Sequence, residues 1–164
     1  MYHLESIAES DNEVDIEGCF EDVYKIGEPI GAGSLAKIHS AKNMLTGKEY
    51  SVKKVIRRDL HPSDFAALND EIAVLQEIAE GGRTHVVCLY EVYEDPDATY
   101  IVLERIHGDI LINRIIQKKK YTEFDAKEVV RNLLLGVRHC HKNQIAIRNL
   151  TLDNLMLVRC DFVF

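Results

Sequence analysis

The sequence predicts an α+β fold with a small antiparallel sheet of five strands, one helix packed on it, and further helices after it. Two observations support this prediction. Short extended runs bounded by glycine, proline or other turn residues occur before residue 57 and again between residues 85 and 105. Apolar residues at spacings of three and four occupy residues 62–80 and two stretches after Gly108. This order of elements favours an α+β fold built of two packed layers.

The five strands are predicted at residues 24–30, 37–43, 48–56, 85–95 and 99–105. Glycine-containing turns follow the first two strands, and the Asp-Pro-Asp turn at 95–97 separates the last two. Tight connections of this kind join neighbouring antiparallel strands. We therefore expect a meandering sheet interrupted once, by a helix after the third strand.

The helix at 62–80 begins at Pro62, which suits a first helical turn. Two more helices are predicted at 109–119 and 123–142, and Thr122 is a good N-cap for the second of them. The apolar stripe of that last helix consists of Ala126, Val129, Val130, Leu133, Val137 and Cys140.

Charge is distributed unevenly along the chain. The net charge is −7, but the first 24 residues hold eight acids and no Lys or Arg, which leaves about +1 for the remainder. Such a segment is typical of a solvated, disordered extension, predicted here at residues 1–21, although it could also dock on a basic partner. No basic stripe indicates nucleic-acid binding.

Nothing in the sequence predicts secretion or membrane insertion. We see no signal peptide and no apolar run long enough to cross a bilayer. The four cysteines are far apart and form no CxxC pair, which favours reduced thiols. We therefore expect a cytoplasmic or otherwise intracellular protein with no membrane partner.

The glycine-rich turn within residues 30–38 (IGAGSLAKI) lies between two predicted strands. Glycines allow backbone N–H groups to approach a phosphate closely, but glycines in a hairpin often serve only the turn. The third glycine of the usual G-x-G-x-x-G pattern is Ala36. Both interpretations stay open on this motif alone.

Lys53 and Glu71 are the strongest candidates for a charged pair. Ser51 and Lys53 share one face of their strand because side chains alternate, and Glu71 flanks the apolar face of the 62–80 helix. A carboxylate that faces a sheet needs a cation, and Lys53 is suitable. The alternatives are a solvent-facing lysine and a rim glutamate whose carboxylate stays in water.

In this order, the segments resemble a Ser/Thr protein kinase of the calcium/calmodulin-dependent group over about residues 22–157. The matching runs are IGAGSLAKI, YSVKKV, EIAVLQEI, VCLYEVYED, TYIVLERI, YTEFDAKEVVRNLLLGVRHCHKNQI and IRNLTLDNLML. The resemblance implies a kinase N-lobe and hinge at residues 22–107. It also implies the truncated start of a C-lobe at 108–164, with its first helices and catalytic loop.

The resemblance further implies an ATP-binding cleft. Lys53 would pair with Glu71 and contact the α- and β-phosphates, and Leu103 would be the gatekeeper. The other implied nucleotide contacts are Ile30, Gly31, Gly33 and Ile38 above the nucleotide, Ser51 beside adenine, Glu104 to Ile106 at the hinge, and Met156 below the base.

The catalytic loop departs from the kinase pattern H-R-D-L-x-x-x-x-N. Residues 147–154 read IRNLTLDN, so Asn149 occupies the position of the catalytic aspartate and Thr151 that of the phosphate-contacting lysine. An amide is not a base at neutral pH, and the lost cation weakens charge stabilisation in the transition state. Arg148 and Asn154 keep the family residue types, either in use or as unused ancestry.

The sequence offers two candidate magnesium ligands. Asn154 is a metal-ligand candidate, and Asp161, within the run DFV, is the second. Asp161 arrives earlier in the chain than the family pattern requires, and Val163 replaces the following glycine. The alternative is a chance Asp-Phe pair.

We therefore expect a pseudokinase or a very weak Ser/Thr protein phosphotransferase that binds ATP, with or without Mg²⁺. The chain ends at Phe164, before an activation loop, so the stripe of the 123–142 helix is expected to be exposed and available to a protein partner. The alternatives are a compensated active kinase, a non-enzymatic interaction module, and a truncated fragment without a role of its own.

Overall fold

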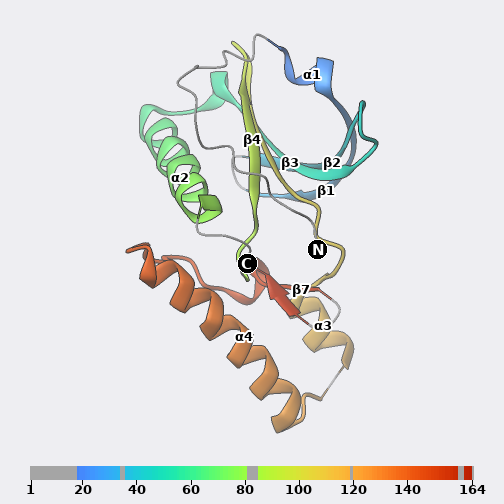
Figure 1. The fold of residues 1–164 in the computed structure, drawn as a ribbon, viewed down its shortest axis with the longest axis vertical. Helices are drawn as coiled ribbons and strands as arrows, with labels where there is room; N and C mark the ends of the chain where they lie inside the picture. Colours follow the sequence, from blue (N-terminus) through green and yellow to red (C-terminus); the bar gives the residue numbers. More distant parts are fainter. Residues whose placement is uncertain (1–17, 34–35, 81–84, 119, 159–160, 164) are drawn as a thin grey trace.

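The structure, a computed structural model, describes residues 18–33, 36–80, 85–118, 120–158 and 161–163. A five-stranded antiparallel sheet with one long helix forms the upper part in Figure 1, and two helices with a small three-stranded sheet form the lower part. The predicted α+β class and the five-stranded sheet are confirmed. The predicted disorder of residues 1–21 stays a prediction, since residues 1–17 lie outside the described residues.

All five predicted strands are present in the large sheet. They are β1 (Tyr24–Ala32), β2 (Ala36–Asn43), β3 (Glu49–Ile56), β4 (Leu89–Glu94) and β5 (Ala98–Glu104), in the spatial order β1-β2-β3-β5-β4. β3 is central, with Lys53 paired to Ile38 on one side and Ile101 on the other. Successive side chains of β3 alternate between the faces, as predicted: Val52 packs on one side of the sheet and Val55 on the other.

Helix α2 (Pro62–Glu80) covers the face on which Val55 lies, with the bounds that its apolar spacing predicts. Leu68 is buried against Val55 and Ile101, and Ile72 and Leu75 pack around them. These contacts fix the helix against the centre of the sheet, and they bring its neighbouring polar positions to the level of β3.

The opposite face of the sheet carries an aromatic cluster made of Phe20, Tyr24, Tyr50, Tyr90, Tyr93 and Tyr100. Phe20 begins the short helix α1 (Phe20–Val23) and is only 3% exposed. Its ring stacks on Tyr100 at a centroid distance of 4.3 Å. The packed part of the chain thus includes Phe20, a residue that the sequence assigned to the acidic extension.

Two tyrosines of this cluster share one acceptor. The hydroxyls of Tyr24 and Tyr93 donate to the same Oε2 of Glu91, at 2.9 and 2.7 Å. Burial, and then the hydrogen bond to Glu91, raise the pKa of Tyr93 to about 12 and the pKa of Tyr24 further still.

These shifts predict an alkaline loss of stability. A folded-state pKa above the unfolded value of 10.0 means that the stabilisation is complete below pH 10 and declines as the pH rises toward 12. Chemical denaturation across this range should show the decline in the free energy of unfolding. The Tyr93→Phe variant lacks the Tyr93 hydroxyl, so its stability should decline less steeply, with Tyr24 as the remaining source. An equally steep decline in that variant would exclude Tyr93 as a source.

The lower part begins with β6 (Asp109–Ile110) and α3 (Leu111–Lys118). The helix predicted at 109–119 therefore starts two residues late. The reason is that Asp109 and Ile110 pair with Leu157 and Met156 of β7 (Met156–Val158), which in turn pairs with β8 (Asp161–Val163). The Leu111 N–H donates to the Leu155 carbonyl at 2.8 Å and closes this junction.

Helix α4 (Glu123–Lys142) has the predicted bounds and the predicted cap. The Thr122 hydroxyl accepts from the Asp125 N–H at 3.1 Å, while the Asp125 carboxylate accepts from the Thr122 N–H. Among the described residues, no helix is both long and apolar enough to span a membrane.

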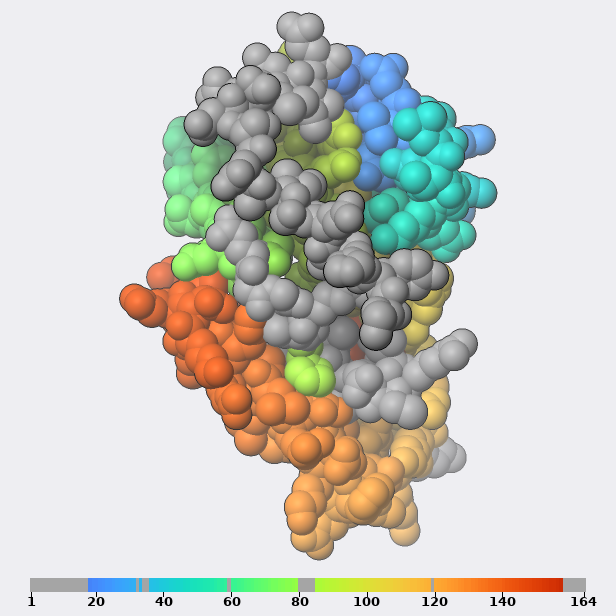
Figure 2. Space-filling view, in the orientation of Figure 1, coloured from blue at the N-terminus to red at the C-terminus, as the bar shows by residue number. Residues whose placement is uncertain are grey.

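The predicted exposure of the α4 stripe is wrong for half of it. Cys140 is 1% exposed, and Val129 and Leu133 pack against Leu111 and Leu155 of the same lower part. Ala126 and Val130 are the exposed members of the stripe, and Val130 is 49% exposed. Figure 2 shows α4 at the lower end of the molecule, where its outer side faces solvent.

Candidate functional site

The site centres on an ion pair between β3 and α2. Lys53 Nζ lies 2.6 Å from Oε1 and 2.7 Å from Oε2 of Glu71, so it contacts both carboxylate oxygens. The side chains are 23% and 44% exposed, respectively. The predicted pairing is therefore present, and the pair is open to solvent on the side of Glu71.

A cavity of about 230 Å³ adjoins this pair. Gly33, Lys53 and Glu71 are the predicted site residues that line it. The remaining lining residues are Ala36, Val55, Leu60, Asp64, Ala67 and Leu68. The cavity thus lies between the glycine-rich turn, the central strand and α2.

Sequence reasoning missed Asp64 as a cavity residue, although a signal was present. Asp64, Ala67, Leu68 and Glu71 fall at positions i, i+3, i+4 and i+7 of α2, which places them on one helical face. The cavity consequently holds two carboxylates and one lysine.

The glycine-rich turn is partly closed on itself. The Gly33 N–H donates to the Ala36 carbonyl at 2.8 Å, so this N–H is occupied by the turn in this conformation. Gly31 pairs with Ile38 across the hairpin, and a Cβ at Gly31 would meet only ordinary contacts with that side chain, at 3.6 Å. Neither glycine has a positive φ, so turn geometry alone does not require glycine at these two positions.

The predicted adenine contacts lie away from the cavity. Ser51 is buried and pairs with Leu103 across β3 and β5. The Glu104 N–H donates to the Cys88 carbonyl at 2.8 Å, which ends the sheet before the connection to β6. Ile106 in this connection is half-buried, and its backbone makes no hydrogen bond within the described residues. Ile30, at 42% exposed, and the half-buried Met156 complete the predicted set without lining the cavity.

The predicted catalytic loop, residues 147–154, is exposed apart from its first residue. The Asn154 side-chain amide donates to the Asn149 carbonyl at 3.0 Å and holds the loop in a compact turn. Within the described part of the chain, the side chains of Asn149 and Thr151 make no hydrogen bond. Ile147 instead packs against the cluster of Ile78, Val86, Cys140 and Ile145, so the residue at the family's histidine position anchors the loop to a core shared by α2 and α4.

The metal-ligand candidates are not brought together by described side chains. Asn154 keeps its amide oxygen free of the bond above, since only the amide nitrogen is used. The backbone of Asp161, in β8, pairs with that of Val158, in β7. The side chain of Asp161 lies outside what the structure describes. The described residues hold no cluster of three His, Cys, Asp or Glu side chains suited to a metal ion.

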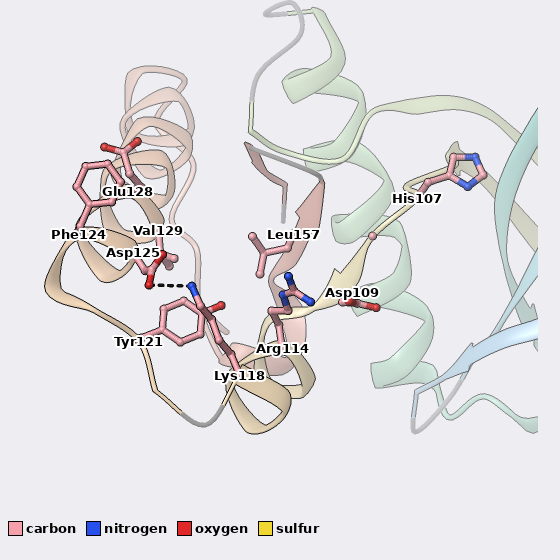
Figure 3. A pocket seen from close by; sticks show the side chains of 11 residues that line it. His107, Asp109, Arg114, Lys118, Tyr121, Phe124, Asp125, Glu128, Val129 and Leu157 are labelled. Carbon is pink, nitrogen blue, oxygen red and sulfur yellow. Dashed lines mark ion pairs between the residues drawn. The ribbon is translucent and has the colours of Figure 1, made fainter.

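A second cavity of about 410 Å³ lies between α3 and the start of α4 (Figure 3). Lys118 pairs with Asp125 there at 2.7 Å and lies over the Tyr121 ring. Lys118 and the Thr122 cap lower the pKa of Asp125 to about 2. Charged side chains of both signs, Arg114, Asp109 and Glu128, line the rest of the cavity, so the lining does not favour a cation over an anion.

Comparisons with known proteins place this geometry in context. The family model for the protein kinase domain matches residues 24–163. The chain is 32% identical over 141 residues to calcium-dependent protein kinase 26 of Arabidopsis thaliana, covering 85% of this chain and 29% of that protein. It is 30% identical over 151 residues to a probable myosin light chain kinase of Dictyostelium discoideum, covering 90% of this chain and 47% of that protein.

A third similar protein is the MAP kinase-interacting serine/threonine-protein kinase 2 of Xenopus laevis, at 31% identity over 140 residues. The match covers 85% of this chain and 29% of that protein. The chain thus spans less than half the length of these relatives. The predicted resemblance to Ser/Thr kinases of the calcium/calmodulin-dependent group is confirmed.

Proposed function

Because the chain belongs to the protein kinase domain family, we propose that it is a kinase-like domain that binds ATP and transfers phosphate weakly or not at all. The observation that carries the proposal is the Lys53–Glu71 pair beside the cavity, together with the altered catalytic loop. A lysine held by a carboxylate presents its charge at a fixed place, where it can contact nucleotide phosphates.

The connection between β5 and β6 supports binding of the adenine end of the nucleotide. The Ile106 backbone groups have no hydrogen-bond partner within the described residues, so they can pair with a base without breaking a protein bond. Mg²⁺ would arrive with the phosphates, because the described residues hold no cluster of three His, Cys, Asp or Glu side chains that could bind it without them.

Phosphate transfer is the part of family chemistry that this chain is poorly equipped to perform. Asn149 cannot accept a proton at neutral pH, and Thr151 supplies no positive charge to the developing transition state. Binding and transfer therefore separate in this proposal: the cleft is retained while the loop is not.

Thermal unfolding of the whole chain with ATP, with and without Mg²⁺, tests the binding claim. We expect the melting temperature to rise with nucleotide concentration, since a ligand that binds only the folded state stabilises it. An unchanged melting temperature at millimolar ATP would reject the proposal. A cooperative transition in the absence of nucleotide would also show that the chain folds by itself.

A loop-repair variant tests the transfer claim. We expect Asn149→Asp with Thr151→Lys to raise phosphotransfer by about 10²–10⁴, the range for general acid–base catalysis. The measurement is radiolabel transfer to a generic peptide, in a chimera in which the later part of a relative's kinase domain follows residue 158. The matched control is the chimera with Asn149 and Thr151 unchanged; equal rates in both would contradict this explanation of the defect.

A second candidate function is a protein-binding module built on α4. Phe124, Val130 and Leu134 are 73%, 49% and 59% exposed, which is unusual for three large apolar side chains of one helix. Val130→Asp with Leu134→Asp should abolish capture of a protein partner and leave ATP stabilisation intact. Partner capture that survives both substitutions would exclude this face.

A further inference from the structure

Arg57 joins three separate elements of the upper part. It follows β3 directly, at the start of a short 3-10 turn (Arg57–Asp59). Its Nη1 lies 2.7 Å from Oε2 of Glu94 on β4 and 3.5 Å from the Thr99 hydroxyl on β5. Its guanidinium carbon also lies 4.7 Å from the ring centroid of Phe65 on α2.

The backbone of Arg57 strengthens this connection. The Arg57 N–H donates to the Asp97 carbonyl in the turn between β4 and β5 at 2.8 Å. The position of the residue is therefore fixed at the β4–β5 end, and the side chain reaches from this fixed point to the first turns of α2. Arg57 is itself only 24% exposed at its side chain, so the contact with Phe65 is partly shielded from water.

The contact with Phe65 bears on Glu71 because both residues belong to α2. They are six positions apart, which corresponds to about 9 Å along a helix. A helix of 19 residues moves nearly as a rigid body, so a shift of its first turns also shifts Glu71. The apolar contacts of Leu68, Ile72 and Leu75 hold the middle of α2 on the sheet, and Phe65 lies before them in the first turns of the helix. The ion pair with Lys53 adds little to this, because Glu71 is 44% exposed and exposed pairs contribute little.

We propose that Arg57 is a positioning residue: its guanidinium, held between Glu94 and Phe65, keeps α2 at the distance from the sheet at which Glu71 reaches Lys53. The consequence for nucleotide binding rests on the proposed function. The position of α2 does not, and it can be measured separately.

Arginine suits this role better than lysine, although a lysine can contact an acid and a ring that lie close together, as Lys118 does with Asp125 and Tyr121. A planar guanidinium can stack on a ring and pair with a carboxylate at its edge at the same time, whereas an ammonium is a compact point charge. Arg57→Lys should therefore keep the charge near Glu94 and lose most of the contact with Phe65.

The chain offers a matched control at Lys118. This lysine also combines an ion pair, 2.7 Å to Asp125, with a position 4.9 Å from an aromatic ring, that of Tyr121. It lies on α3, in the lower part of the molecule, and so it should not affect α2.

The experiment compares the whole chain with Arg57→Ala, Arg57→Lys and Lys118→Ala. Hydrogen exchange followed by mass spectrometry reports on peptides that cover residues 65–75, and titration with ATP gives the dissociation constant. We expect Arg57→Ala to speed exchange in these peptides and to weaken ATP binding by about two- to fivefold, the factor for one lost cation–π contact. Arg57→Lys should show most of this effect, and Lys118→Ala should show none.

The outcomes separate the two proposals. An unchanged rate of hydrogen exchange for residues 65–75 in Arg57→Ala overturns the positioning role, whether or not the dissociation constant for ATP changes. Faster exchange with an unchanged dissociation constant overturns the link to the site. If the wild type does not bind ATP, the proposed function fails while the exchange result still decides the role of Arg57. If Arg57→Ala does not fold, Phe65→Leu breaks the same contact by removing the aromatic ring. Faster hydrogen exchange of residues 65–75 in that variant supports the role, and unchanged exchange rejects it.

Discussion

Lys53→Met is expected to abolish most of the stabilisation that ATP gives to this chain. Methionine keeps a similar length and loses the only cation among the described residues that line the 230 Å³ cavity. Glu71 and Asp64 would then leave that cavity purely negative, which disfavours a polyphosphate. Loss of a hydrogen bond to a charged group costs about 1.5–3 kcal/mol, so ATP affinity should fall by about tenfold or more.

The measurement is the ATP-dependent rise in melting temperature, and the adjacent lysine is its control. Lys54 points to the other face of β3, where it lies 4.9 Å from the Tyr100 ring centroid. Lys54→Met removes the same charge from the same strand but leaves the cavity unchanged, so ATP should stabilise it as it does the wild type. If both variants respond equally to ATP, Lys53 is not a phosphate contact.

Phe20→Ala is expected to destabilise the chain by about 3–5 kcal/mol, the usual range for removing a buried aromatic ring. Phe20 stacks on Tyr100 and Tyr24 and meets the edge of Tyr93, so its loss would open a cavity bounded by three rings. The cost should be at the upper end of the range because rings held in a sheet cannot close the gap easily.

Equilibrium denaturation measures this difference in the free energy of unfolding. Phe124→Ala is the control, since it removes the same ring from a site that is 73% exposed. Its effect should stay within about 0.5 kcal/mol. Similar losses in the two variants would mean that Phe20 is not packed as described.

The site-bearing core was predictable because two simple periodicities coincide there. Alternation along β3 placed Lys53 on the same face as Ser51, and the three–four spacing of α2 placed Glu71 beside its apolar face. Each pattern depends on many residues, so a single exception does not disturb it. The family motifs then fixed the pairing between them.

Phe20 was not predictable by the same reasoning. It is one apolar residue beside Glu21 and Asp22, and composition over the first 24 residues is dominated by acids. Its burial depends on Tyr24 of the adjoining β1 and also on Tyr93 of β4 and Tyr100 of β5, which are distant in sequence. The start of α3 was displaced for a related reason: pairing with β7, about 47 residues later, outweighed the local helical pattern of Asp109 and Ile110.

The aromatic cluster also gives the molecule an unusual optical property. The chain has seven tyrosines and no tryptophan, and five of the tyrosines belong to the cluster. Near-ultraviolet circular dichroism and intrinsic fluorescence will therefore report chiefly on the side of the sheet opposite α2. A nucleotide that binds beside Lys53 should leave the tyrosine signals nearly unchanged. Release of α1 from the sheet should alter them strongly. These signals can therefore distinguish nucleotide binding from loss of α1 packing in a single sample.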